Sequence, residues 1–205
     1  MNKIQSLFCK IFLKWIVDLI WIKEVRGLEN IPKENFILAA NHQSHWDQVI
    51  TAYLCVPRSF TYLGQIDKYT GFEGFLRSLI YKIAGVIPVH RYNEESKKRA
   101  IEECVKRLKK GEILIMYPEG TRSRDGKIHE AKAGIGKIHL LSKKPILPVA
   151  IKGNFEIMPV GKVFPKFKKI VKINIGKPLN FEGEKDCQKI ADRVMEEIKK
   201  LFNQL

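Results

Sequence analysis

The sequence predicts a single-domain α/β sandwich in which helices flank a largely parallel central sheet. Short apolar runs typical of buried strands alternate along the chain with longer segments of helical periodicity. The length of 205 residues suits one domain with a substantial core. No internal repeat, low-complexity segment or linker divides the sequence. These observations favour one layered domain over several smaller ones.

The expected strands are short and apolar, as strands covered on both faces usually are. The runs FILAA at residues 36–40 and ILIM at 113–116 contain no polar residue. Both therefore suit the centre of a sheet. Strands are expected at 36–40, 59–63, 85–89, 113–116 and 146–151, with an edge strand at 171–175.

The expected helices lie between these strands and carry apolar residues three and four positions apart. In the helix that starts at Glu94, Cys104 and Leu108 fall on the inward face, and Gly111 ends it. Helices are expected at about 44–55, 72–83, 94–110, 133–142 and 186–202.

Residues 1–24 are expected to form an amphipathic helix that precedes the main domain, residues 25–205. From Ile4 to Ile20, apolar residues recur at helical spacing and leave a narrow polar stripe. The uncharged runs are far shorter than the ~18 residues that a membrane-spanning helix needs. Charges within the apolar region and the lack of a small-residue cleavage site do not fit a signal peptide.

Two placements of this helix are consistent with its pattern. Its apolar arc is wide, contains Trp15 and Trp21, and is edged by basic residues. This favours a helix in the membrane interface, with the tryptophans at headgroup depth. The alternative is a helix that packs on the protein's own core.

Charge points to a polyanionic partner. The chain has 37 Lys and Arg against 22 Asp and Glu, a formal charge of +15. Between Glu156 and Glu182 there is no acidic residue, and lysines alternate with Phe164 and Phe167. This mixture suits either nucleic acid or anionic lipid headgroups. Nothing resembles an RNA-binding fingerprint or a recognition helix, so we expect an anionic membrane surface and no nucleic acid.

The four cysteines, Cys9, Cys55, Cys104 and Cys187, are scattered without paired spacing. This argues against a disulfide framework and a zinc site, and favours a reducing compartment.

The segment NHQSHWD, from Asn41 to Asp47, follows the first apolar run directly. A histidine with a carboxylate nearby suits general-base chemistry, because the carboxylate fixes the tautomer of the ring. Five residues on a helix turn through ~500°, so His42 and Asp47 would not share a helix face. They meet only if His42 lies in the turn before a helix that Asp47 opens. The alternative is a capping box formed by Ser44 and Asp47.

The segment YPEGTRSRDG, from Tyr117 to Gly126, follows a second apolar run. Gly120 allows close approach of the backbone, and Arg122 offers a planar cationic fork suited to phosphate oxygens. Alone, the segment fits a solvated turn equally well. Two such loops after two strands indicate a shared crevice, where α/β sheets bind ligands.

Taken together, these segments resemble the glycerolipid acyltransferase family, typified by 1-acylglycerol-3-phosphate acyltransferase. NHQSHWD is similar to the family's first motif, in which a histidine and an aspartate are separated by four residues (HX4D), here His42 and Asp47. YPEGTR resembles the third motif, which contributes Glu119, Gly120, Thr121 and Arg122.

The second and fourth motifs of the family are matched more weakly. GVIPVHR resembles the second and ends in Arg91, although His90 stands where many members carry an acid. ILPVAIKG resembles the fourth, centred on Pro148. All four motifs occur in the family's order between about residues 36 and 153.

The resemblance implies that residues 25–205 form an acyltransferase catalytic domain on the cytoplasmic face of a membrane. His42 would act as the general base, oriented by Asp47, and Arg122 would hold the acceptor phosphate, with Arg91 as a second anion contact. The residues Glu119, Gly120, Thr121 and Pro148 would complete substrate binding. The implied acceptor is lysophosphatidic acid, the implied donor acyl-CoA or acyl carrier protein, and neither a cofactor nor a metal is expected.

Three alternatives stay open from the sequence. A family member could use another lysolipid acceptor, although the intact EGTR sequence favours a phosphate. A non-catalytic anionic-lipid-binding protein would have the basic surface but no need for the His42–Asp47 pair. A metal hydrolase would need ligands such as His42 and His45, whose spacing is shorter than the helical HxxxH pattern.

Overall fold

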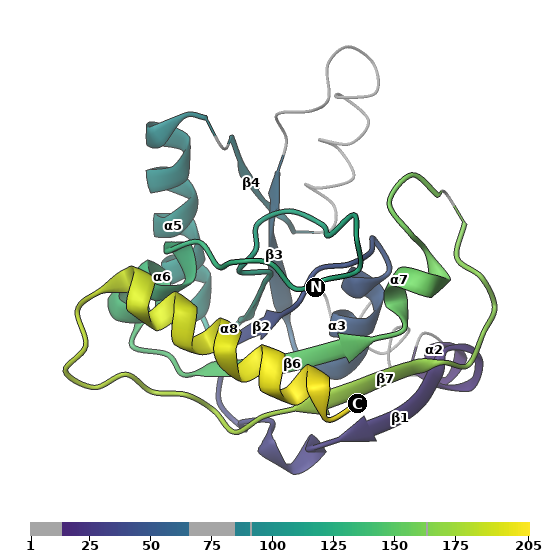
Figure 1. Cartoon of the computed structure of the whole chain (residues 1–205). Coiled ribbons are helices and arrows are strands. Elements are labelled where there is room, and N and C mark those ends of the chain that lie inside the picture. Colours follow the sequence, from purple (N-terminus) through teal and green to yellow (C-terminus); the bar gives the residue numbers. More distant parts are fainter. Residues whose placement is uncertain (1–13, 66–84, 91, 163) are drawn as a thin grey trace.

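The computed structural model describes residues 14–65, 85–90, 92–162 and 164–205, which form one α/β domain around a seven-stranded sheet (Figure 1). The strand order is β1-β7-β6-β2-β5-β3-β4. The strands are β1 (Ile22–Arg26), β2 (Ile37–Ala40), β3 (Phe60–Gln65), β4 (Ile87–Val89), β5 (Ile113–Met116), β6 (Ile146–Lys152) and β7 (Val171–Ile175).

The sheet is largely parallel, as expected. Strand β2 pairs in parallel with β5 on one side and with β6 on the other. Strands β6 and β7, by contrast, pair in antiparallel fashion. Strand β7 was expected at an edge, and this is wrong, because β1 pairs with its outer side. The sequence of β1, IKEVR, is too charged and too short to indicate a strand by itself.

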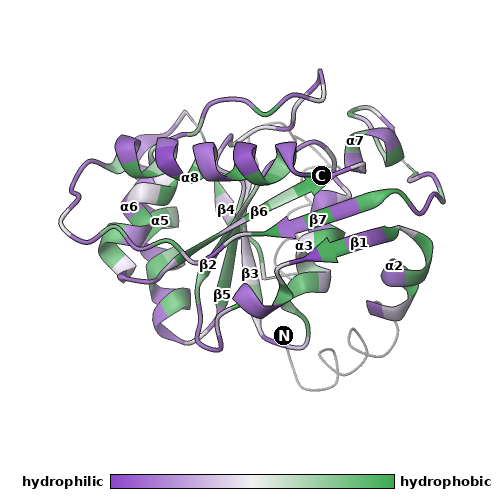
Figure 2. Cartoon of the chain, turned by 60° about the horizontal axis from the view of Figure 1, so that its bottom comes forward, coloured by the Kyte–Doolittle hydropathy of each residue, from purple (hydrophilic) through white to green (hydrophobic). Residues whose placement is uncertain are grey.

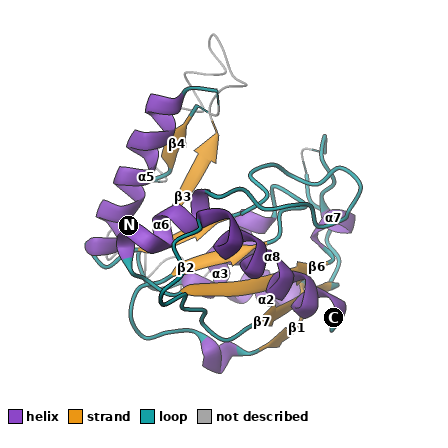
Figure 3. Ribbon diagram, turned by 60° about the vertical axis from the view of Figure 1, so that its left-hand side comes forward, coloured by secondary structure: helices purple, strands orange, loops and turns teal. Residues whose placement is uncertain are grey.

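Helices cover both faces of the sheet (Figures 1 and 3). Helices α2 and α3 pack together on one face, and α5, α6 and α8 form a contacting row on the other. The helices are α2 (Lys14–Ile20), α3 (Asp47–Cys55), α5 (Glu94–Lys109), α6 (Gly134–Ser142), α7 (Asn154–Ile157) and α8 (Cys187–Asn203), with a 3-10 turn at Leu28–Asn30.

Strand β2 shows why its sequence is apolar throughout. Ile37 and Ala39 pack into the hydrophobic cluster under α5, α6 and α8, whereas Leu38 and Ala40 pack into the cluster under α2 and α3. Each of these side chains is fully buried. Since both faces of the strand are covered, no polar position is left, and the strands at the centre of the sheet appear mainly in hydrophobic colours in Figure 2.

The C-terminal helix α8 anchors the row on the second face. Asp186 caps its first turn by accepting hydrogen bonds from the backbone N–H groups of Gln188 and Lys189. Its buried stripe includes Val194 and Ile198, which pack into the cluster on this face of the sheet. The amphipathic pattern expected for 186–202 is thus present, with one residue's difference at each end.

The N-terminal segment differs from the expected interfacial helix at its C-terminal end. In α2, Val17 is buried, and Trp21 after it is only 5% exposed because it packs against Trp46. Trp21 therefore lies in the core and not at headgroup depth. Residues 22–24 belong to β1, so the expected boundary at residues 24 and 25 falls within a strand.

Some expectations concern residues outside the described part of the chain. These are residues 1–13, with most of the expected N-terminal helix, and 66–84, with the expected helix at 72–83. Within the described ranges, every helix is too short or too polar to cross a membrane.

Candidate active site

The loops that follow β2 and β5 are joined at one edge of the sheet. These strands are neighbours, so their carboxyl ends place the two motif loops side by side. The backbone N–H of His42 donates to Glu119 Oε1 at 2.7 Å, and Ser123 N–H donates to the His42 carbonyl at 2.7 Å. The shared crevice expected from the sequence is therefore formed.

His42 and Asp47 are in direct contact. His42 Nδ1 lies 2.9 Å from Asp47 Oδ2. His42 lies in the turn after β2, and α3 begins at Asp47, as the spacing of the two residues requires. The histidine side chain is 13% exposed and the aspartate side chain is fully buried.

The Asp47 carboxylate accepts more than the histidine bond. The backbone N–H groups of Gln43 and Ser44 donate to Oδ2 at 2.6 and 2.8 Å. The side chain of Asn154 donates to Oδ1 at 2.7 Å. Asp47 thus also satisfies N–H groups before the helix, as a capping residue does, so both interpretations of the sequence are partly realised.

Tyr117, directly after β5, stacks on one face of the His42 ring. The two rings stack with centroids 4.0 Å apart and an angle of 11° between their planes. The Tyr117 hydroxyl lies 3.0 Å from the Thr51 hydroxyl, and burial raises the pKa of Tyr117 well above its usual value. A neutral, anchored ring therefore fixes the orientation of the imidazole.

Glu119 connects the loops after β2 and β5 by accepting hydrogen bonds from backbone N–H groups. It is 2% exposed, and its second oxygen accepts from the backbone N–H of His129 at 3.0 Å. Burial raises the pKa of the Glu119 carboxyl above 4.5, although the two N–H groups act against this increase. Gly120 follows with a φ of +65°, which a residue with a side chain rarely adopts.

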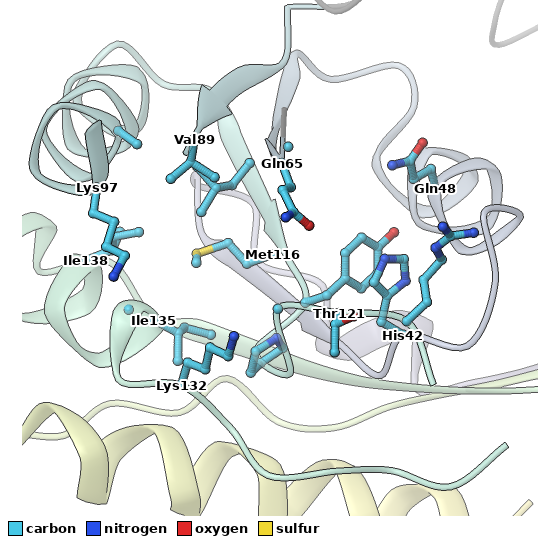
Figure 4. Close-up of a pocket in the computed structure, with 18 of the residues that line it drawn as sticks. His42, Gln48, Gln65, Val89, Lys97, Met116, Thr121, Lys132, Ile135 and Ile138 are labelled. Atoms are coloured by element: carbon cyan, nitrogen blue, oxygen red, sulfur yellow. The ribbon is translucent and has the colours of Figure 1, made fainter. Parts of the chain in front are cut away.

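A pocket of about 420 Å³ opens beside His42 (Figure 4). Its lining includes the cationic side chains of Lys97, Arg122, Arg124 and Lys132. Toward α5 and α6 most of the lining is apolar, and Figure 4 shows Ile135 and Ile138 in that part, with Lys132 and Lys97 beside them. Among the described residues that line the pocket there is no Asp or Glu. The site therefore suits an anionic group joined to an apolar chain.

Comparison with known proteins agrees with this geometry. The model of the family described as Acyltransferase matches residues 23–152, more than half of the chain. The chain belongs to this acyltransferase family.

Curated relatives of this acyltransferase include the 1-acyl-sn-glycerol-3-phosphate acyltransferase of Bacillus subtilis, 30% identical over 97% of both chains. The chloroplastic 1-acyl-sn-glycerol-3-phosphate acyltransferase BAT2 of Brassica napus is 27% identical over 84% of this chain. The chain spans only 50% of that protein, and 60% of the Pseudomonas aeruginosa relative of the same name.

A solved structure has the same fold. The crystal structure of the 1-acyl-sn-glycerophosphate (LPA) acyltransferase PlsC from Thermotoga maritima matches with a TM-score of 0.75 and 27% sequence identity. The match covers 99% of this chain and 79% of that one.

Most of the site residues predicted for the acyltransferase converge. His42, Gly120, Thr121 and Arg122 line the pocket. Asp47 and Glu119 are buried next to these residues and accept hydrogen bonds from the backbone of the first motif loop. Arg91 lies outside the described residues.

Pro148 does not join the pocket. It lies within β6, where it is buried and pairs in register with Ala39 of β2. Its carbonyl accepts from Gly176 N–H at 2.9 Å, and a Cβ at Gly176 would approach its ring to 2.9 Å. The expected substrate-binding role of Pro148 has no support in the described pocket, and its place in the sheet is structural.

Several contributors to the site were not predicted. Tyr117 belongs to the quoted motif segment, but only the folded strand shows that its ring covers His42. Asn154 follows the fourth motif directly, which was the one signal for it. Arg124 and Lys132 add cationic charge that the sequence analysis assigned to Arg122 and Arg91.

Among the described residues, no metal site is formed, and neither Ser44 nor Cys55 faces the pocket as a nucleophile. No three His, Cys, Asp or Glu side chains of the described ranges converge in a way that would hold a metal ion. Ser44 is buried and donates to the Met158 carbonyl at 2.7 Å. Cys55 is buried too, and burial raises the pKa of its thiol to about 12. Neither side chain is therefore presented to the pocket as a nucleophile.

Proposed function

We propose that this acyltransferase transfers a fatty acyl group from an acyl thioester to the free 2-hydroxyl of 1-acylglycerol 3-phosphate, giving phosphatidic acid. The observation that carries the proposal is the His42–Asp47 pair beside a pocket that combines cationic side chains with an apolar wall. The relatives named as 1-acyl-sn-glycerol-3-phosphate acyltransferases support the same acceptor.

His42 acts as the general base in this mechanism. Its Nδ1 is engaged by Asp47, which leaves Nε2 for the hydroxyl of an acceptor in the pocket. Nε2 takes the hydroxyl proton as the oxygen attacks the thioester carbonyl. Asp47 keeps the ring in this tautomer and stabilises the imidazolium that forms, as the aspartate of a hydrolase triad does.

The transfer is direct, and its bonds balance within one cycle. The ester C–O bond forms, the C–S bond breaks, and the thiolate takes the proton back from His42. An acyl-enzyme is not required, because the acceptor hydroxyl is itself the nucleophile. The burial of Ser44 and Cys55 supports this single displacement.

Arg122 binds the acceptor phosphate, and Arg124 and Lys132 add to the positive potential there. Arg91 is a second anion contact in the proposal, made from its motif alone. The apolar end of the pocket accommodates an acyl chain. The donor is acyl-CoA or acyl carrier protein, both acidic partners that suit a chain of charge +15. The reaction needs neither a cofactor nor a metal.

We place the reaction at the cytoplasmic face of a membrane, with the anionic lipid surface and not nucleic acid as the polyanionic partner. The three described cysteines are free, which agrees with a reducing compartment. The exposed Trp15 and Leu19 of α2 support contact with lipid.

The test is thiol release from palmitoyl-CoA by the purified chain with detergent-dispersed acceptors. Lysophosphatidic acid is compared with a 1-acylglycerol that lacks the phosphate, and mass spectrometry identifies the product. Release that requires lysophosphatidic acid and yields phosphatidic acid supports the proposal. Equal rates with both acceptors contradict the phosphate requirement, and no release with acyl-CoA or acyl carrier protein donors contradicts the function.

A further inference from the structure

The loop from Pro159 to Ile170 exposes both apolar and cationic side chains. Phe164 is 83% exposed and Phe167 is 76% exposed, among the most exposed large apolar residues of the described chain. Four lysines of the loop, at positions 162, 166, 168 and 169, are exposed as well. Exposed phenylalanines give no stability to a chain surrounded by water, so this pattern indicates a partner.

The loop is held in a defined position. Lys166 N–H donates to the Ile157 carbonyl at 2.9 Å, and the indole N–H of Trp21 donates to the Lys166 carbonyl at 2.9 Å. The Trp21 ring also stacks on Phe167, with centroids 5.7 Å apart. These contacts fix the part of the loop that exposes Phe167.

Trp21 connects this loop to α2. Helix α2 exposes Trp15 at 75% and Leu19 at 72%, with Lys14 beside them. Trp21 follows α2 directly and touches the loop, so the exposed side chains of both segments belong to neighbouring parts of one side of the molecule (Figure 1). At the other end of the loop, Val160 lines the pocket.

We propose that the Pro159–Ile170 loop is a second membrane-docking element, which inserts Phe164 and Phe167 between the headgroups of an anionic phospholipid bilayer. The lysines provide the complementary charge, and no acidic residue of the loop opposes them. Docking through this loop brings the membrane to the entrance of the pocket. That this docking helps a lysolipid acceptor to reach the pocket rests on the proposed function, whereas membrane binding by the loop does not.

The test is cosedimentation of the full chain with phosphatidylcholine vesicles that contain or lack phosphatidylglycerol. Phe164→Ser should lower the partition coefficient roughly tenfold. The triple variant Lys162→Glu, Lys168→Glu, Lys169→Glu should abolish the preference for phosphatidylglycerol. Matched controls are Leu141→Ser, at an exposed leucine of α6, and the triple variant Lys185→Glu, Lys189→Glu, Lys199→Glu near and along α8.

Wild-type-like binding by the loop variants, or equal losses in the controls, would overturn the docking role. Dimerisation of the wild type that Phe164→Ser abolishes, without a change in vesicle binding, would assign the surface to a second copy. Turnover of a dispersed short-chain lysophosphatidate separates the two proposals. Loop variants should keep this turnover, and its absence in the wild type would count against the proposed function alone.

An independent observation concerns Asn154, the first residue of α7. Asn154 is fully buried, and its side-chain N–H reaches Asp47 Oδ1 at 2.7 Å. Among the described residues, no donor reaches its own Oδ1. The other Asp47 oxygen already accepts from His42 and two backbone N–H groups. Asn154 is thus the side chain that fixes the second oxygen of the carboxylate.

The geometry assigns to Asn154 the role of a positioning residue, which keeps Asp47 turned toward His42. The substitution Asn154→Asp would put two carboxyl groups within about 2.7 Å of each other, and both cannot be ionised together. The introduced carboxyl group would still donate to Asp47 when it is protonated. The inference rests on the proposed function, because it concerns the same reaction.

The test is the pH dependence of kcat/KM in Asn154→Asp, Asn154→Leu and the control Asn174→Leu. The activity of Asn154→Asp relative to the wild type should fall as pH rises, whereas Asn154→Leu should lower kcat at every pH with little change in acceptor KM. Asn174 donates to the Leu201 carbonyl far from the site, so its variant should lower the unfolding free energy without moving the profile. Profiles of both Asn154 variants that match the wild type would overturn the assignment.

Discussion

His42 depends on contacts with three other residues. Asp47 holds Nδ1, the ring of Tyr117 covers one face, and the Glu119 carboxylate accepts from the His42 backbone N–H. Each contact restricts a movement that an exposed histidine could make. A base held in a fixed position is more effective than a mobile one. The sequence predicted the first contact from spacing, but the ring stack depends on which strands are neighbours and is not a local property.

Arg122→Ala should raise the KM for lysophosphatidic acid roughly 10- to 100-fold, because a charge-assisted contact with the phosphate contributes about 1.5–3 kcal/mol. The value of kcat should change less, since the contact is made in ground and transition states alike. Steady-state thiol release at varied acceptor concentration measures both constants.

Arg193→Ala is the matched control, because Arg193 lies on α8 over the Phe181 ring and does not line the pocket. An unchanged acceptor KM in Arg122→Ala would remove Arg122 from the phosphate site.

Glu119→Gln should change the free energy of unfolding by less than about 1 kcal/mol at acidic pH. There the protonated wild-type carboxyl resembles the amide, because each has one carbonyl oxygen and one hydrogen-bearing group for the two backbone N–H groups. In the wild type, the carboxyl has a raised pKa, so its contribution is fully present below pH 4.5 and is lost as pH rises through the folded pKa.

The wild type should therefore lose stability relative to Glu119→Gln as pH rises. Urea unfolding of both proteins across this pH range measures the change. A wild type that gains stability relative to the variant as pH rises would mean that the folded pKa of Glu119 is lowered and not raised.

At the scale of elements, the strands that carry the site were predictable and the outer parts of the sheet were not. Runs such as ILIM are apolar because both faces are covered, so the sequence predicts them directly. Strand β1 exposes charged side chains, and only its pairing with β7 makes it a strand. The helix α2 was predicted from periodicity, but periodicity does not distinguish a lipid surface from the core that buries Val17 and Trp21.

Helices α6 and α8 meet at Gly136, where a Cβ would lie 2.1 Å from the Cys187 carbonyl oxygen. Gly136→Ala should force the helices apart and lower the unfolding free energy by about 1–3 kcal/mol. It should also reduce turnover, because Ile135 and Ile138 of α6 line the pocket. Denaturant unfolding and thiol release measure the two effects.

Gly134→Ala is the matched control in the same helix, because a Cβ there meets no atom within 4 Å. It should leave stability unchanged or raise it by roughly 0.5–1 kcal/mol, the usual gain of alanine over glycine in a helix. Equal destabilisation by both changes would mean that helix propensity, and not the α6–α8 contact, controls the response.

At the scale of the whole molecule, the pocket lies at the sheet edge where the two motif loops meet, and the Pro159–Ile170 loop reaches it through Val160. Family, fold class and the His42–Asp47 pair were predictable, since they depend on motifs and local periodicity. Pro148 and Asn154 were not, because their roles depend on strand register and on a contact across 107 residues of sequence.

Vesicle binding should depend steeply on salt, since the chain carries a charge of +15. The Debye length falls from about 10 Å at 0.1 M to about 3 Å at 1 M, which screens the lysines from anionic headgroups. Binding to vesicles that contain phosphatidylglycerol should therefore fall strongly between these concentrations. Salt-independent cosedimentation would assign docking to the apolar side chains alone.

The central claim is that His42 is the base of an acyl transfer, and one comparison tests it most directly. Thiol release from palmitoyl-CoA with lysophosphatidic acid is measured for His42→Ala and for His129→Ala, which removes an exposed histidine that also lies 2.9 Å from an aspartate, Asp125. His42→Ala should lose at least roughly 100-fold in kcat with an intact fold, whereas His129→Ala should stay near the wild-type rate. A folded His42→Ala protein with a near-normal rate would contradict the mechanism.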